Sequence, residues 1–133
     1  MKRFLVALTT ILLAALALFA AKDGAAITFD RTKVDFGTVR SNSGPVSFDY
    51  TFTNTGNKPL IIITVTNGGC GCTKPSFPKE PIQPGKKGKI TIHFHPEGRS
   101  GEVNREVKVR TNAAKGKTVK LRFSGVIVPG SRK

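Results

Sequence analysis

Cys70 and Cys72 are the residues of this chain whose types and spacing are best suited to chemistry. They are its only two cysteines, they are separated by Gly71, and they lie in the glycine-rich stretch 67–75. A disulfide between residues i and i+2 needs a sharp bend, and we expect Gly71 to allow it by adopting backbone angles that other residues avoid. Such a small ring restricts the unfolded chain very little, so we expect it to add little stability and to be easily reduced.

The spacing leaves the state of this cysteine pair open. The two residues can form a disulfide that fixes the loop, or stay reduced and pack at one end of the fold. They can also act as an exported thiol-redox site, in which the positive charge of Lys74 favours a thiolate. Export favours the disulfide, because disulfides persist in oxidising compartments and the number of cysteines is even.

Metal binding is a further alternative for the same pair. Two thiolates one residue apart suit Cu(I) better than tetrahedral zinc. His93 and His95 share the outward face of a predicted strand, and they would complete a Cys₂His₂ set with Cys70 and Cys72. The sequence does not give the distance between these histidines and the loop, and no cofactor is predicted.

The chain contains none of the common catalytic motifs. It has no Gly-x-Ser-x-Gly elbow, no phosphate-binding loop and no zinc-protease helix motif. The strands that flank the cysteine loop offer no paired carboxylates. We therefore predict a protein that is not an enzyme and has no catalytic residue.

The positive charge of the chain is concentrated in its second half. The formal net charge is +14, and residues 74–133 contain fifteen basic and four acidic residues. Alternation places basic side chains on the outward faces of neighbouring predicted strands, where they would form one patch that either binds anions or is an ordinary solvated surface. The expected partner is a protein or an anionic envelope polymer, and export makes nucleic acid an unexpected one. The candidate patch residues are Lys89, Lys108, Arg110, Lys120 and Arg122.

The N-terminus has the layout of a secretory signal. Met1-Lys2-Arg3 is followed by an apolar run from Phe4 to Ala21. We predict a signal peptide over residues 1–21, one domain over 22–133 and a secreted or periplasmic location, with no transmembrane segment after the signal. The alternative is an uncleaved anchor, since 18 apolar residues are at the lower limit for crossing a bilayer.

Strands that alternate between apolar and polar residues follow the signal and are separated by turn residues. Val46–Thr53 is the clearest, with three aromatic side chains on one face. Gly37 is expected to mark a bulge or a close backbone approach, and Gly125 to break the alternation near the C-terminus. Leu60–Thr66 is apolar on both faces at its start, which predicts a central strand covered on both sides. About seven such strands predict an all-β, immunoglobulin-like antiparallel sandwich, with a small barrel as the alternative.

Several stretches together resemble a known family. The chain is similar to the bacterial domain-of-unknown-function family 1573, which in turn is similar to the immunoglobulin-like domains of the abnormal-spindle, Hydin and major-sperm-protein group. The resemblance covers about residues 27–128, and it implies an exported β-sandwich with no established activity and no catalytic residue to transfer. The related domains mostly serve as binding or scaffold modules. The matching stretches are Asp35–Val39, Phe52–Ile62, Gly69–Pro75, Pro81–Ile90 and Arg110–Asn112.

Overall fold

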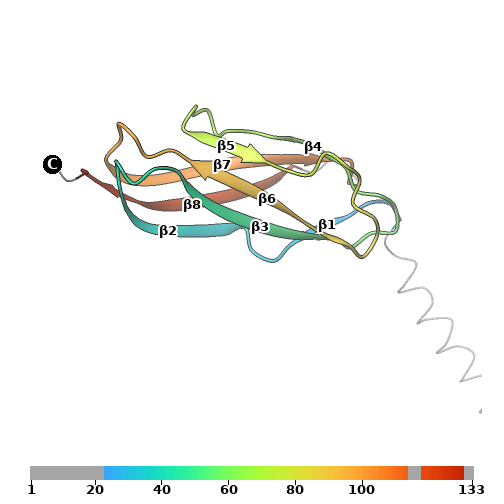
Figure 1. The fold of residues 1–133 in the computed structure, drawn as a ribbon. Coiled ribbons are helices and arrows are strands. Elements are labelled where there is room, and N and C mark those ends of the chain that lie inside the picture. Colours follow the sequence, from blue (N-terminus) through green and yellow to red (C-terminus); the bar gives the residue numbers. More distant parts are fainter. Residues whose placement is uncertain (1–22, 114–117, 131–133) are drawn as a thin grey trace, which may run out of the picture.

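The computed structural model describes residues 23–113 and 118–130 (Figure 1). The predicted signal peptide lies outside these residues. Within them, no helix is long and apolar enough to cross a membrane. The described residues form eight strands: β1 (Ile27–Phe29), β2 (Lys33–Arg40), β3 (Val46–Asn54), β4 (Ile62–Val65), β5 (Thr73–Ser76), β6 (Lys87–Phe94), β7 (Gly101–Thr111) and β8 (Val119–Val128).

The strands form two four-stranded sheets that pack face to face (Figure 1). One sheet has the order β1-β3-β6-β5 and the other has the order β2-β8-β7-β4. The predicted all-β immunoglobulin-like sandwich is therefore confirmed. One pairing departs from a purely antiparallel arrangement, because β2 runs parallel to β8. The predicted bulge is also present, since the register of this pair shifts between Asp35 and Thr38, and Gly37 has a φ of 79°.

The prediction of a central strand at Leu60–Thr66 is wrong. The strand in this stretch is β4, and it lies at the edge of its sheet with β7 as its one partner among the described strands. Leu60 and Ile62 are buried, whereas 42% of Ile61 and 49% of Ile63 is exposed. A run of apolar residues shows that a segment is hydrophobic, but it does not show that both of its faces are covered.

Aromatic rings from both sheets fill the space between them. The ring centroids of Phe94 on β6 and Phe123 on β8 are 5.7 Å apart, and Phe36 on β2 stacks on Phe94 at 5.4 Å. Gly125 occupies an inward position of β8, and the ring of Phe36 takes the space that a side chain would fill, since a Cβ there would lie 2.2 Å from this ring. The alternation of β8 is therefore unbroken, contrary to the prediction for Gly125.

Two buried polar side chains fix the sandwich internally. The hydroxyl of Tyr50 on β3 donates a hydrogen bond to the carbonyl of Arg122 on β8, which ties one sheet to the other. Burial raises the pKa of Tyr50 above its ordinary value, and the charge of Arg31 opposes this shift. Asn54 is fully buried, and its amide donates to the carbonyls of Lys58 and Ile82 at 2.8 and 2.9 Å. Asn54 begins the turn Asn54-Thr55-Gly56, which lies in the stretch Phe52–Ile62 that resembles the family, so this part of the resemblance has a structural role.

The packing of Gly125 leads to a first prediction. Gly125→Ala should lower the free energy of unfolding by about 1–3 kcal/mol, because the new methyl group displaces the ring of Phe36. Gly71→Ala is the matched control, since a Cβ at Gly71 meets no atom within 4 Å, and its effect should stay within about 0.5 kcal/mol. Urea unfolding of the two variants measures the difference. Equal midpoints for the two variants would contradict this account of the core.

The burial of Tyr50, the one tyrosine of the chain, predicts a specific loss of stability in base. Its pKa is raised in the folded state, so its contribution is fully present below the unfolded value of about 10 and is lost as the pH rises above it. At pH 8, Tyr50→Phe should cost about 1 kcal/mol through the lost hydrogen bond. Between pH 9 and pH 11 the stability difference between wild type and Tyr50→Phe should shift by about 1.4 kcal/mol in favour of the variant. Urea unfolding across this range tests the prediction, and a constant difference would refute it.

Candidate functional site

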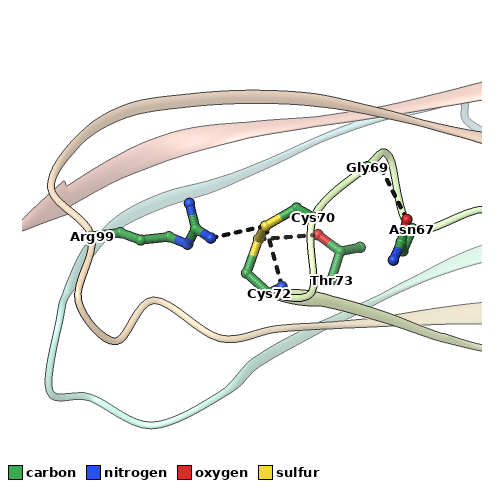
Figure 2. Close-up of a disulfide and its surroundings, with 6 residues drawn as sticks. All are labelled: Asn67, Gly69, Cys70, Cys72, Thr73 and Arg99. Atoms are coloured by element: carbon green, nitrogen blue, oxygen red, sulfur yellow. Dashed lines mark hydrogen bonds between the residues drawn. A yellow bond between two sulfur atoms is a disulfide. The ribbon is translucent and has the colours of Figure 1, made fainter.

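The cysteine loop connects the two sheets at one end of the sandwich. It runs from β4 in one sheet to β5 in the other, and Cys70 and Cys72 form a disulfide within it, with their Cα atoms 5.2 Å apart (Figure 2). Both cysteines are buried, with 6% and 7% exposure. The Cys72 carbonyl accepts a 2.8 Å hydrogen bond from the backbone N–H of His95, which anchors the loop to the end of β6.

The positive φ values of this loop belong to glycines other than Gly71. Gly68 and Gly69 have φ values of 68° and 80°, whereas Gly71 is not among the residues with positive φ. The side-chain oxygen of Asn67 accepts a hydrogen bond from Gly69 N–H at 2.9 Å, and the Cys70 N–H donates to the Asn67 carbonyl at 3.3 Å. The expectation that Gly71 supplies special backbone angles is therefore wrong. A turn closed by the hydrogen bond from Thr73 N–H to the Cys70 carbonyl spans Gly71, but Gly71 has no positive φ.

Arg99 is a site residue that no sequence motif marks. It lies in the loop 95–100, which also connects the two sheets, and its side chain points at the disulfide (Figure 2). Its Nη2 atom lies 3.0 Å from Sγ of Cys70. Twenty-nine residues separate the two in sequence, so only the meeting of two loops brings them together. The prediction placed the positive charge of Lys74 beside the cysteine pair. In the structure, the cation in contact with Sγ of Cys70 is Arg99.

The two histidines do not form a metal site with the cysteines. The ring of His93 lies 2.8 Å from the Ser47 hydroxyl on the outer face of its sheet, and His95 meets the loop through its backbone. Across the described parts of the chain, no three His, Cys, Asp or Glu side chains are grouped so that they could hold a metal ion. The Cys₂His₂ set is therefore not assembled, because the strand that carries the histidines directs His93 away from the buried sulfurs.

Four of the five predicted patch residues lie on the outer face of one sheet. Lys108 on β7 is directly opposite Lys120 on β8, and both are exposed. Arg110 is exposed further along β7, opposite Thr64 of β4. Arg122 also faces outward, but Glu106 lies opposite it and the two form an ion pair at 2.9 Å. We refer to Lys108, Arg110 and Lys120 as the basic face.

Lys89 does not belong to this basic face. It lies on β6, which is part of the other sheet, and its Nζ is 3.8 Å from Asp49 on the neighbouring strand β3. The prediction of one continuous patch is therefore wrong for Lys89. Strand alternation tells which residues point outward, but it does not tell to which sheet a strand belongs.

Solved structures with a similar fold include both bacterial and human proteins. A protein of unknown function from Porphyromonas gingivalis W83 is 16% identical with a TM-score of 0.67, and the match covers 80% of this chain and 48% of that chain. The ASH/PapD-like domain 7 of human CEP192 is 13% identical with a TM-score of 0.60, with 79% and 87% covered. These likenesses, at low identity, show the shared fold.

The same fold also occurs as a part of larger proteins. The VesB protease of Vibrio cholerae is 16% identical with a TM-score of 0.61 over 75% of this chain and 31% of that chain. The periplasmic chaperone SfaE is 17% identical with a TM-score of 0.52 over 80% and 58%. The chain thus spans about a third of VesB and about half of the Porphyromonas protein. No curated protein matches the chain in sequence.

A family model provides the match at the level of sequence. It covers residues 27–127, which include all eight strands except the last residue of β8. The model carries the description "Protein of unknown function (DUF1573)". The matched region contains the Asn-Thr-Gly turn, the cysteine loop with its disulfide and the basic strands β7 and β8. The chain therefore belongs to the DUF1573 family.

Proposed function

We propose that this chain is an exported, non-enzymatic protein-binding module that binds an acidic, extended segment of a partner protein. The binding surface consists of the basic face on β7 and β8 together with the neighbouring edge strand β4. The N-terminal sequence supports export, and so does the similarity to a periplasmic chaperone. The similarity to PapD-like domains supports a binding role rather than a catalytic one.

The observation that carries this proposal is the pair of lysines that face each other across β7 and β8. Side chains directly opposite on an antiparallel pair lie about 5 Å apart, and like charges in this position destabilise the sheet. At the next outward-facing pair of the same two strands, Glu106 lies opposite Arg122 and forms an ion pair with it. An acidic residue opposite a basic one is therefore compatible with this sheet. No acidic side chain pairs with Lys108 or Lys120 among the residues that the structure describes. A binding role for anions explains why this repulsion is retained.

Strand β4 adds a second element beside the basic face. It is the edge of its sheet in the described structure, so no strand pairs with its outer side, while Leu60 just before it pairs with Ile82. Ile61 and Ile63 are two of the three large apolar residues that are most exposed in the described chain. An extended peptide can pair with such an edge through its backbone while its side chains contact the neighbouring surface. Acidic side chains on that peptide would reach Arg110 and Lys108 on β7.

Charge reversal tests the binding surface directly. Lys108→Glu combined with Lys120→Glu should lower the affinity for a polyglutamate peptide by at least about tenfold at low salt, since charge pairs across an interface each contribute on this order. Binding by the wild type should weaken as salt rises from about 0.05 to 0.5 M, because screening shortens the reach of exposed charges. Calorimetric titration at several salt concentrations measures both effects.

A matched control separates this surface from the overall positive charge. Lys86→Glu combined with Lys87→Glu changes the net charge equally, but these exposed lysines lie at the start of β6 in the other sheet. This control should bind nearly as the wild type does. Equal losses in the two double variants would show attraction by net charge alone and would overturn the proposal. Wild-type binding to heparin but not to polyglutamate would assign the face to an anionic polysaccharide instead of a protein.

The stability of a single variant provides an independent check. Lys120→Glu places an acidic residue opposite Lys108 and should raise the free energy of unfolding by about 0.5 kcal/mol while it weakens peptide binding. A residue kept only for the fold should not show gains in stability together with losses in binding. Urea unfolding and calorimetric titration of the same protein sample give the two values, and a variant that is less stable than the wild type would contradict the repulsion argument.

A further inference from the structure

Cys70 is surrounded by hydrogen-bond donors that its disulfide form does not need. The guanidinium of Arg99 donates to its Sγ at 3.0 Å, and the backbone N–H of Cys72 donates to the same atom at 3.2 Å (Figure 2). A disulfide sulfur is a weak acceptor, whereas a thiolate is a strong one that pairs well with a cation. Among the described residues Arg99 makes no ion pair with a carboxylate, so its charge remains directed at the sulfur. The site is therefore better matched to a Cys70 thiolate than to a permanent disulfide.

The two sulfurs have different surroundings. Sγ of Cys72 lies 3.6 Å from the Thr73 hydroxyl, and no cation contacts it in the described structure. Lys74 follows on β5, and His95, just after β6, contacts the loop through its backbone N–H. In thiol–disulfide exchange the sulfur that is the more stable thiolate is the better leaving group. The asymmetry therefore assigns Cys70 as the leaving sulfur and Cys72 as the one that is attacked.

The loop does not depend on the disulfide for its shape. Hydrogen bonds from Cys70 to Asn67 and from Thr73 to Cys70 fix the backbone on both sides of the pair, and the bond from His95 holds Cys72. A ring of three residues removes little entropy from the unfolded chain, so it stabilises the fold only slightly. The two cysteines can therefore exchange between oxidised and reduced forms while the sandwich stays folded.

We propose that Cys70–Cys72 is a redox-active disulfide that exchanges reversibly with thiols, and that Arg99 stabilises the thiolate on Cys70. A thiolate of the partner attacks Sγ of Cys72, the bond between the two protein sulfurs breaks, and its electron pair moves to Sγ of Cys70. A second thiolate then attacks the mixed disulfide and releases Cys72. In total two partner thiols lose two electrons and two protons and form a disulfide, and the protein gains two thiols. This activity is independent of the binding surface on β4, β7 and β8.

Redox equilibrium with glutathione tests the role of Arg99. The folded protein is incubated in mixtures of reduced and oxidised glutathione, trapped by alkylation and analysed by mass spectrometry. Arg99→Gln should shift the equilibrium constant about tenfold toward the disulfide, because a hydrogen bond to a charged sulfur is lost. Arg99→Lys should lie between this variant and the wild type. Arg40→Gln, which removes an exposed arginine at the end of β2, is the matched control and should behave as the wild type.

Two outcomes of this experiment overturn the proposal. One is a disulfide that excess dithiothreitol does not reduce while circular dichroism shows the native fold, since the bond is then purely structural. The other is an equal shift in Arg99→Gln and Arg40→Gln, since Arg99 then acts only through net charge. Unchanged circular dichroism of each variant ensures that the comparison is between folded proteins.

Single-cysteine variants test the assigned asymmetry without relying on the disulfide. Cys72→Ser retains Cys70 beside Arg99, and Cys70→Ser retains Cys72 beside Thr73. At pH 6.5, the thiol in Cys72→Ser should react with iodoacetamide about tenfold faster than the thiol in Cys70→Ser, since thiolates are the reactive form and a neighbouring cation favours them. Adding Arg99→Gln to Cys72→Ser should remove this difference. Equal rates in the two single variants would overturn the assignment of Cys70.

Discussion

The packing of aromatic rings between the two sheets is the constraint on which the rest of the structure depends. Phe36, Phe94 and Phe123 come from three strands and both sheets, and their contacts hold the inner faces together. Strands that follow one another in the chain often lie in different sheets, so the connecting loops must cross the ends of the sandwich. The loops 66–72 and 95–100 are two such crossings at the same end. Their meeting brings Arg99 to Cys70 and creates a site that neither loop has alone.

The outer face of the sheet that contains β7 and β8 carries charged pairs, whereas the core is apolar. On β7 and β8, one cross-strand pair is a complementary ion pair between Glu106 and Arg122, and the next is a repulsive pair of lysines. This repulsive lysine pair is the observation on which the proposed binding of an acidic partner rests. Ile61, just before β4, and Ile63, within it, are exposed at the adjacent sheet edge.

The cysteine loop and the basic face are separate features of one scaffold. The loop is buried and held by its own backbone hydrogen bonds, and its chemistry involves one cation and two sulfurs. The basic face is exposed, so dissolved salt screens the electrostatic interactions of its charges. The proposed binding role and the proposed redox role therefore do not depend on each other. Both features lie within residues 27–127, the region that matches the DUF1573 family model.

The sequence by itself determined the strands with strict alternation, the all-β sandwich and the outward phase of Lys108, Arg110, Lys120 and Arg122, because a period of two depends only on neighbouring residues. It also marked Cys70 and Cys72 as the pair capable of chemistry. Tertiary structure alone decided that β4 is an edge, that Lys89 belongs to the other sheet and that Gly68 and Gly69, rather than Gly71, take the positive φ values of the loop. It alone placed Arg99 against the sulfur. These features depend on which strands and loops become neighbours in space. The packing of the two sheets around one core decides this, and no local sequence pattern encodes it.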